Sequence, residues 1–213
     1  MKPKTLDLRK KYKELYSPLA KKVVEVKVPH LKFIMLDGEI EPGKTPTISE
    51  SFGQAMMAMY GVAYTLKFAS KLRERNPIDY PVMAMEGLWW VKSGEWSFQS
   101  KEPWSYTLLM MLPAHITPAM FRLAIGDVRA KRGENPALAK VRLESFAEGR
   151  CIQIMHVGPY ADEPRTLALM DEYMRAHGLR FRGKHHEIYM GDPRRAKPER
   201  LKTILRHAVE RIG

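Results

Sequence analysis

The feature that most constrains the fold is an internal repeat, because each half of this 213-residue chain shows the order strand, helix, strand, strand. In both halves an amphipathic helix follows the first strand, and a pair of strands follows the helix. The helix of the first half begins at Ser49, a favourable N-cap residue. The helix of the second half begins at Pro164 and ends at Gly178. The expected strands lie at 23–28, 31–36, 82–91, 104–112, 150–157 and 185–190.

Repeated βαββ units pack side by side, so that the edge strand of one sheet pairs with the edge strand of the other. We therefore predict an α+β fold in which two βαββ modules, related by a pseudo-twofold axis, form one concave antiparallel sheet. The helices are expected on one face, and the other face forms a ligand cleft at the seam between the modules. The expected segments of this single domain are a basic N-terminal arm at 1–22, a first module at 23–116, a connecting helical segment at 117–148 and a second module at 149–213.

The last segment, 201–209, fits two structures. The spacing of its apolar residues slightly favours a helix, whereas alternation through Leu201, Thr203 and Leu205 fits a strand. The internal repeat requires a strand at this place, and we expect a strand.

Three further patterns predict helices. The lead-in at 1–22 has apolar spacing that suits a short amphipathic helix, and Thr117-Pro118 begins a helix that continues to about Val128. The helix after Ser49 is expected to cover the sheet with a stripe of residues at three- and four-residue steps. The stripe comprises Phe52, Ala55, Met56, Met59, Tyr60, Ala63, Tyr64 and Phe68.

The bulk properties limit the class of protein. No apolar run approaches the ~18–20 residues that span a bilayer, and the first residues lack the apolar region of a signal peptide, so we expect a cytoplasmic protein. The single Cys151 lies in an apolar run and is expected to be a buried, unreactive thiol. The net charge of +12 favours attraction to polyanions, but no nucleic-acid-binding motif accompanies it, so specific nucleic-acid binding is not expected.

The strand at 185–190 carries the most informative side chains. Alternation places Glu187 and Tyr189 on one face of the strand, about 6.6 Å apart at roughly 3.3 Å per residue. An enclosed carboxylate and phenol can bind a cation or transfer a proton. Three interpretations of Glu187 stay open: a solvated surface residue, a structural acid paired with Arg194 or His185, and a residue of the cleft.

Trp89 and Trp90 are adjacent and therefore face opposite sides of their strand. One of them is expected under a helix and the other in the groove, and the pattern does not say which. Tyr160, at a strand end, is a candidate for the same groove, and methionines such as Met85 would supply adaptable walls.

Other chemistries lack support. Adjacent histidines on a strand diverge, and no histidine–carboxylate spacing typical of a metal site is present. GxSxG, GxGxxG and P-loop motifs are absent, so neither a catalytic triad of that kind nor a nucleotide or other cofactor is expected.

Four segments in this order make the chain resemble the stand-alone branch of the GyrI-like small-molecule-binding family. They are Val28–Gly38, Met85–Trp90, Met155–Tyr160 and His186–Tyr189 followed by Asp192-Pro193-Arg194-Arg195. The resemblance covers nearly the whole chain and implies paired βαββ modules with a cleft between them. Related domains sense effectors in multidrug-responsive regulators. Some stand-alone members are similar to hydrolases that open the cyclopropane ring of DNA-alkylating natural products. The roughly twenty residues before the first strand are too few for the DNA-binding half of such a regulator.

The resemblance implies that Glu187 is the buried glutamate of the cleft, with Tyr189 beside it. These two are the candidate catalytic residues, and the candidate ligand-binding residues are Trp89, Trp90, Tyr160, Met85 and Phe33. The expected function is binding of bulky lipophilic or cationic small molecules, with hydrolysis of cyclopropanoid alkylating agents left open. The alternatives are a non-catalytic drug-binding protein or effector sensor, and a basic protein that contacts nucleic acid. The pattern leaves open whether the protein is a monomer or a dimer.

Overall fold

The computed structural model describes residues 2–93, 100–192 and 195–213. The helices are α1 Leu8–Lys11, α2 Lys13–Tyr16, α3 Glu50–Leu72, α4 Pro118–Arg132 and α5 Glu163–Ala176, with short 3₁₀ turns η1 Pro136–Lys140, η2 Tyr160–Asp162 and η3 Pro198–Arg200. The strands are β1 Lys4–Thr5, β2 Val24–Val28, β3 Leu31–Glu39, β4 Ile78–Asp79, β5 Met85–Trp90, β6 Ser105–Leu112, β7 Arg142–Phe146, β8 Gly149–Val157, β9 Leu179–Phe181, β10 His185–Tyr189 and β11 Lys202–Arg211.

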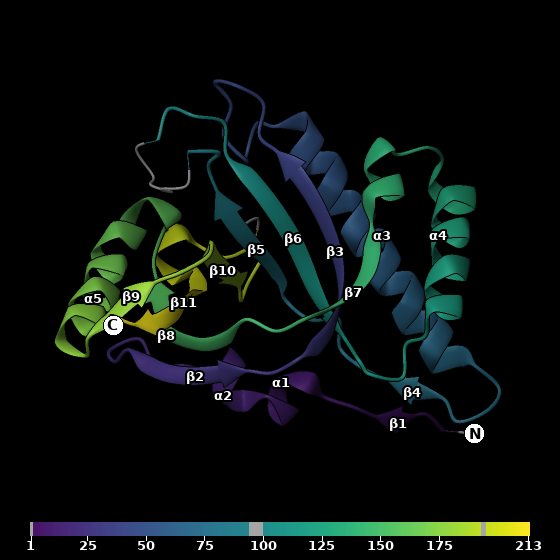
Figure 1. Cartoon of the computed structure of the whole chain (residues 1–213). Helices are drawn as coiled ribbons and strands as arrows, with labels where there is room; N and C mark the ends of the chain where they lie inside the picture. The colour runs from purple at the N-terminus through teal and green to yellow at the C-terminus, as the bar shows by residue number, and fades with distance from the viewer. Residues whose placement is uncertain (1, 94–99, 193–194) are drawn as a thin grey trace.

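The predicted α+β class is confirmed, with one large antiparallel sheet and the long helices on one side of it (Figure 1). In the described residues the sheet has the order β2-β8-β11-β10-β5-β6-β3-β7, with β9 added beside β11. The order β3-β6-β5 on one side of the centre is repeated in reverse as β10-β11-β8 on the other. The two repeats therefore meet edge to edge at the antiparallel pair β5–β10, which we call the seam.

Segment 201–209 forms β11 and is a strand, as the repeat required. It pairs with β10 and β8 along its length, and these tertiary contacts outweigh the weak local preference for a helix. The helix starts are also confirmed, since Ser49 caps α3 and Thr117 caps α4 through their side chains. The sequence also predicts a turn at Gly94 between the strands expected at 82–91 and 104–112, and this position lies outside the described residues.

Each repeat also pairs with a strand from outside it. β2, which was expected in the first repeat, pairs with β8 of the second repeat. β7, from the segment between the repeats, pairs with β3 of the first. Both exchanges extend the sheet at its ends, beyond the two βαββ units themselves.

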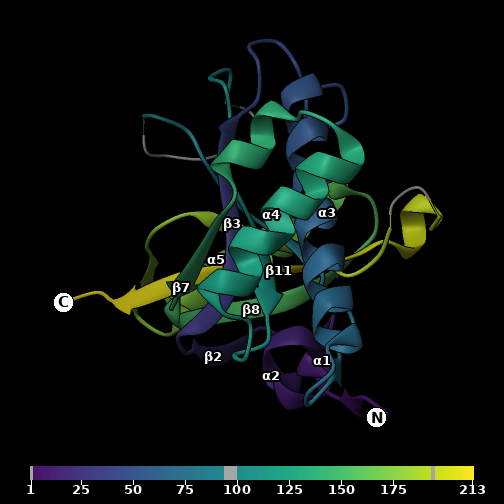
Figure 2. The same cartoon turned by 90° about the vertical axis from the view of Figure 1, so that its right-hand side faces the viewer.

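The two faces of the sheet are covered differently. α3 and α5 lie on one face at either side of the seam, and α4 packs beside α3 (Figures 1 and 2). The opposite face has its own buried cluster, which includes Leu15 and Tyr16 of α2. The 1–22 segment thus forms two single-turn helices that dock on this second face, where one amphipathic helix was expected.

The stripe expected on α3 is only partly buried. Ala55, Met59 and Ala63 pack against the sheet, whereas Tyr60, Tyr64 and Phe68 are 37%, 45% and 49% exposed. The face of α3 that is buried runs through smaller residues, since α4 packs beside it. No helix in the described part of the chain is both long and apolar enough to cross a membrane.

Candidate functional site

Glu187 lies at the seam, near the middle of the sheet. Its strand β10 pairs with β5 on one side and β11 on the other, so that Glu187 is opposite Gly87 and Leu205. The residue is only 6% exposed. A charged side chain at such a position needs hydrogen-bond partners, because transfer of an unpaired carboxylate out of water is strongly unfavourable.

Both carboxylate oxygens of Glu187 accept hydrogen bonds. The Tyr189 hydroxyl donates to Oε2 at 2.7 Å, and His185 Nε2 lies 3.0 Å from Oε1. The indole N–H of Trp89 then donates to the Tyr189 hydroxyl oxygen at 3.0 Å. The result is a directed chain from Trp89 through Tyr189 to Glu187, which favours negative charge on the carboxylate.

His185 is held by a second histidine. Its Nδ1 lies 2.9 Å from Nε2 of His207 on β11. Burial lowers the pKa of His207 well below its usual value, and the neighbouring His185 lowers it further, so His207 is neutral. The pattern consistent with the Glu187 carboxylate is His207 Nε2–H donating to His185 Nδ1, and His185 Nε2–H donating to Glu187.

A second carboxyl group, which the sequence reasoning missed, faces the same place. Glu163 is the first residue of α5; it is fully buried, and neither of its carboxyl oxygens has a hydrogen-bond partner. Burial and the charge of Glu187 raise the pKa of Glu163 to about 10, so this residue is protonated at neutral pH. The only signal in the sequence is the Glu163-Pro164 helix start, which is equally common on protein surfaces.

Glu163, His185 and Glu187 place their polar atoms within 4.8 Å of one another. We do not assign these residues as metal ligands, because both oxygens of Glu187 already accept hydrogen bonds and His185 Nε2 is one of the donors. The hydroxyl of Thr203, on the neighbouring strand β11, is also buried without a partner. The interior beside Glu163 is therefore polar but incompletely bonded.

Aromatic rings pack around Tyr189 and Trp89, the two side chains that lead to the carboxylate. The Tyr160 ring meets the Tyr189 ring edge-on at 5.9 Å, and Trp89 packs against Phe52 and Trp104 at 5.7 and 5.9 Å. Burial and the charge of Glu187 raise the pKa of Tyr160 to about 12. Trp89 is the buried member of this group, and its other four members, Tyr160, Tyr189, Phe52 and Trp104, are partly exposed. Sequence patterns did not single out Phe52 or Trp104 as members of the site.

The candidate residues divide between the two faces. Trp89, Tyr189, Glu187 and Tyr160 come together, and Met85 is buried under α3 on the same face. Trp90 and Phe33 do not join them. Phe33 belongs to the buried cluster of the opposite face, where its ring meets Phe146.

The prediction that the groove with Glu187 lies on the face opposite the long helices is wrong. Tyr189 packs against the core beneath α3, and Glu163 of α5 lies beside Glu187, so the carboxylate faces the helices. Alternation fixes which residues share a face, but it does not say which face the helices cover. The face opposite α3 and α5 has a hollow of about 490 Å³, whose lining includes Trp90 and Lys184. There the Lys184 ammonium lies 3.2 Å from the centre of the Trp90 ring.

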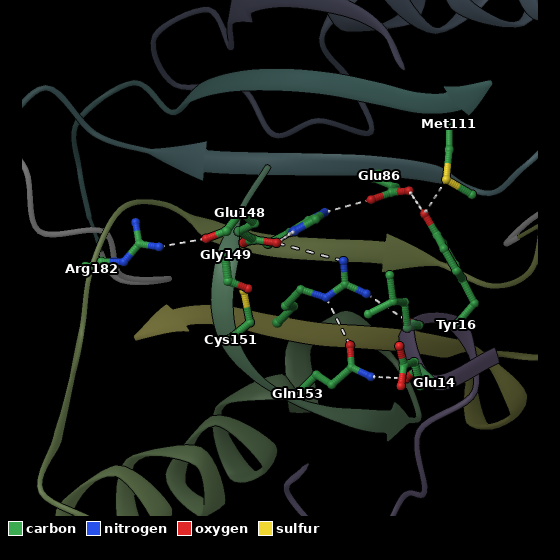
Figure 3. A network of polar contacts seen from close by, with 12 residues as sticks. Glu14, Tyr16, Glu86, Met111, Glu148, Gly149, Cys151, Gln153 and Arg182 are labelled. Carbon is green, nitrogen blue, oxygen red and sulfur yellow. Dashed lines mark hydrogen bonds and ion pairs between the residues drawn. The ribbon is translucent and has the colours of Figure 1, made fainter. Parts of the chain in front are cut away.

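The neighbouring residue His186 lies on the opposite face of β10 by alternation and belongs to a separate buried network, whose members Glu86, Glu148 and Tyr16 are labelled in Figure 3. Its Nε2 and Nδ1 lie 3.1 and 2.9 Å from the carboxylates of Glu86 and Glu148. Glu86 also accepts a 2.6 Å hydrogen bond from the Tyr16 hydroxyl. Arg206 extends the network by donating to Gln153 and to the Leu15 carbonyl. The network connects the strands of the seam to α2, and we interpret it as a structural network that stabilises the fold.

Of the three interpretations of Glu187, a solvated surface position is excluded by its burial. The His185 contact is present, whereas Arg194 lies outside the described residues.

Comparison with known proteins places the chain in a family. Residues 125–208 match the GyrI-like small molecule binding domain. An uncharacterized conserved protein from Listeria innocua is 34% identical, with 96% of this chain and 100% of that chain covered and a TM-score of 0.86. A protein described as a hydrolase, also from Listeria innocua, is 33% identical, with the same coverage of 96% and 100% and a TM-score of 0.81.

More distant structures share the fold alone. The C-terminal domain of EcmrR is 8% identical and aligns over 90% of this chain and 98% of its own, with a TM-score of 0.54. No curated protein sequence matches the chain.

Proposed function

Since the chain belongs to the GyrI-like small-molecule-binding family, we propose that it binds bulky lipophilic compounds beside Glu187 and adds water to them. The substrates in this proposal are alkylating agents that carry a cyclopropane ring conjugated to a carbonyl group. Binding alone, as in a drug-binding protein or an effector sensor, is the alternative. The description of one Listeria innocua relative as a hydrolase favours the catalytic form.

The observation that carries the proposal is the hydrogen-bond chain from Trp89 through Tyr189 to Glu187. A buried carboxylate that accepts two hydrogen bonds is held in one orientation and shielded from bulk water. Aromatic side chains pack beside it, around Trp89 and Tyr189. The rings supply a large rigid apolar surface for a flat ligand. Tyr160 and Tyr189, which are partly exposed, are suited to meet the ligand first.

The reaction can be written with all atoms balanced. Glu187 takes a proton from a water molecule as the water oxygen bonds to a carbon of the cyclopropane ring. The ring C–C bond breaks, and its electron pair passes through the conjugated system to the carbonyl oxygen. Tyr189 donates its hydroxyl proton to that oxygen, and the Trp89 N–H stabilises the charge that develops on the phenol. Glu187 returns the proton to Tyr189 along their 2.7 Å contact, so the net change is addition of one water.

Glu187→Gln tests the proposal. The amide keeps the shape of the side chain but is not a base, so we expect turnover to fall by about 10²–10⁴ while the dissociation constant changes little. Binding is followed by quenching of tryptophan fluorescence, and turnover by mass spectrometry of the water adduct. Glu172→Gln, on the exposed side of α5, is the matched control and should leave both quantities unchanged.

The outcomes separate the alternatives. Saturable quenching with unchanged ligand in the wild-type protein would identify a binding protein without this activity. Turnover that survives Glu187→Gln would remove Glu187 from the mechanism. Retention of the protein on DNA with steep salt dependence, and no binding of the lipophilic compound, would favour the nucleic-acid alternative.

A further inference from the structure

The proposed reaction does not use Glu163, although this residue is among the most unusually placed in the fold. Its side chain is fully buried at the first turn of α5, and both carboxyl oxygens lack a hydrogen-bond partner. One of these oxygens lies within 4.8 Å of polar atoms of Glu187 and His185. Such a group does not stabilise the fold, because a buried polar atom without a partner is unfavourable.

Two carboxyl groups at this separation in a dry interior cannot both be charged. The partners decide which of them is ionised. Glu187 accepts hydrogen bonds from Tyr189 and His185, whereas Glu163 accepts none, so the charge resides on Glu187 and a proton on Glu163. The raised pKa of Glu163, caused by burial and by Glu187, agrees with this distribution.

The surroundings leave the pair with a net charge of −1. The titratable groups that face it from β10, β11, η2 and the loop after β10 are His185, Tyr189, His207, Tyr160 and Asp192. The raised pKa values of both tyrosines and the lowered pKa of His207 keep these three groups neutral at pH 7. Among the described residues, neither carboxyl group forms an ion pair with a lysine or arginine.

We propose that this carboxyl pair exchanges its single proton for the positive charge of a ligand, so that the site accepts both neutral and singly cationic lipophilic compounds. A neutral compound meets Glu187 as the sole charge and leaves the proton on Glu163. A cation held over the rings of Tyr189 and Tyr160 makes a second carboxylate favourable, and Glu163 releases its proton to water. The inference rests on the proposed small-molecule binding and adds the ligand charge that the site tolerates.

Tetraphenylphosphonium, a permanent cation, and triphenylphosphine oxide, a neutral compound of related shape, are suitable probes. Calorimetric titration in two buffers with different ionisation enthalpies counts the protons released on binding. We expect close to one proton released per phosphonium ion bound and none for the oxide. By linkage, phosphonium affinity should rise between pH 6 and pH 9, by up to about tenfold per pH unit, while affinity for the oxide stays constant.

Glu163→Gln keeps the size of the side chain but holds no exchangeable acid proton. In this variant we expect phosphonium binding to release no proton and to lose its pH dependence, with oxide affinity within about twofold of the wild type. Glu172→Gln serves again as the control on the same helix, and thermal melting establishes that both variants fold. Added zinc and added chelator should leave the proton count unchanged.

Each result decides the matter. A phosphonium affinity that is flat with pH in the wild type, or a pH dependence that persists in Glu163→Gln, overturns the proton exchange. Binding of the oxide without binding of the phosphonium overturns the exchange but leaves the proposed binding function intact. Failure of both probes to bind overturns the binding function as well.

Discussion

The indole nitrogen of Trp89 and the hydroxyl oxygen of Tyr189 lie 3.0 Å apart across the seam, so the two halves of the chain share one hydrogen bond at the site. This contact requires a glycine beneath it. A Cβ atom at Gly87 would lie 2.7 Å from Trp89 Nε1 and 3.1 Å from Tyr189 Oη. Real Cβ atoms almost never approach other atoms so closely, and both rings are held by their neighbours.

Gly87→Ala should therefore displace the Trp89 ring and break its hydrogen bond to Tyr189. We expect a loss of about 1–3 kcal/mol in the free energy of unfolding, as for other overpacked cores, together with weaker ligand binding. Urea unfolding and tryptophan fluorescence measure the two effects. Gly126→Ala is the control, because a Cβ atom at this exposed glycine of α4 would meet no other atom within 4 Å, and a helix gains roughly 0.5–1 kcal/mol from alanine. Equal effects of the two substitutions would contradict the steric argument.

Tyr16→Phe tests the docking of the N-terminal segment. The substitution removes the 2.6 Å hydrogen bond to Glu86 and leaves a buried carboxylate oxygen without that donor. We expect a loss of about 1–3 kcal/mol in the free energy of unfolding. Tyr12→Phe, in the same segment but only partly buried, should change it by less than about 0.5 kcal/mol. If Tyr16→Phe proves as mild as Tyr12→Phe, the network does not hold this segment in place.

His186 makes stability depend on pH in the alkaline range. Burial lowers the pKa of His186, but Glu148 and Glu86 outweigh burial and raise this pKa to about 9. Because the pKa in the folded state exceeds the unfolded value of about 6.5, the stabilisation is complete below pH 6.5 and is lost as pH rises towards 9. The loss amounts to roughly 3 kcal/mol at about 1.36 kcal/mol per pKa unit.

Urea unfolding at pH 6.5 and 9.5 measures this loss. His186→Gln should reduce the pH dependence, and the remainder is expected from Glu163, whose raised pKa also lowers stability as pH rises. The variant lowers stability overall, because Glu86 and Glu148 then lose their buried cation. His177→Gln, at the end of α5, should keep the wild-type dependence, since this histidine is exposed. An unchanged slope in His186→Gln would assign the pH dependence to another group.

The repeat pattern predicted that two βαββ units join edge to edge in one antiparallel sheet, and the pairing of β5 with β10 agrees with it. It also resolved 201–209 correctly, where local spacing slightly favoured a helix. Alternation placed Glu187 and Tyr189 on a common face, and they are joined by a hydrogen bond. The repeat and the alternation thus predicted the fold class and the pairing of Glu187 with Tyr189.

What the pattern left out depends on contacts across the fold. The packing of both modules together decides which face of the sheet α3 and α5 cover. The sequence pattern therefore could not say which of Trp89 and Trp90 lies under the helices. Glu163 escaped attention because an acid in the first turn of a helix is ordinary, and only the tertiary fold brings that turn to the seam. Phe52 and Trp104 reach the site from α3 and from the segment before β6 by the same kind of long-range packing.

The exchange of outer strands sets a limit on how this molecule can be divided. β2 completes the sheet of the C-terminal half, and β7 completes that of the N-terminal half. If the chain were cut after β6, β3 would become an edge strand of the N-terminal fragment, with unpaired backbone hydrogen-bonding groups. In the C-terminal fragment β8 would become an edge strand in the same way. Exposed strand borders recruit further strands and aggregate. Although its two halves are repeats, the protein is one folding unit. Point substitutions are therefore better suited than truncations to test the role of each part.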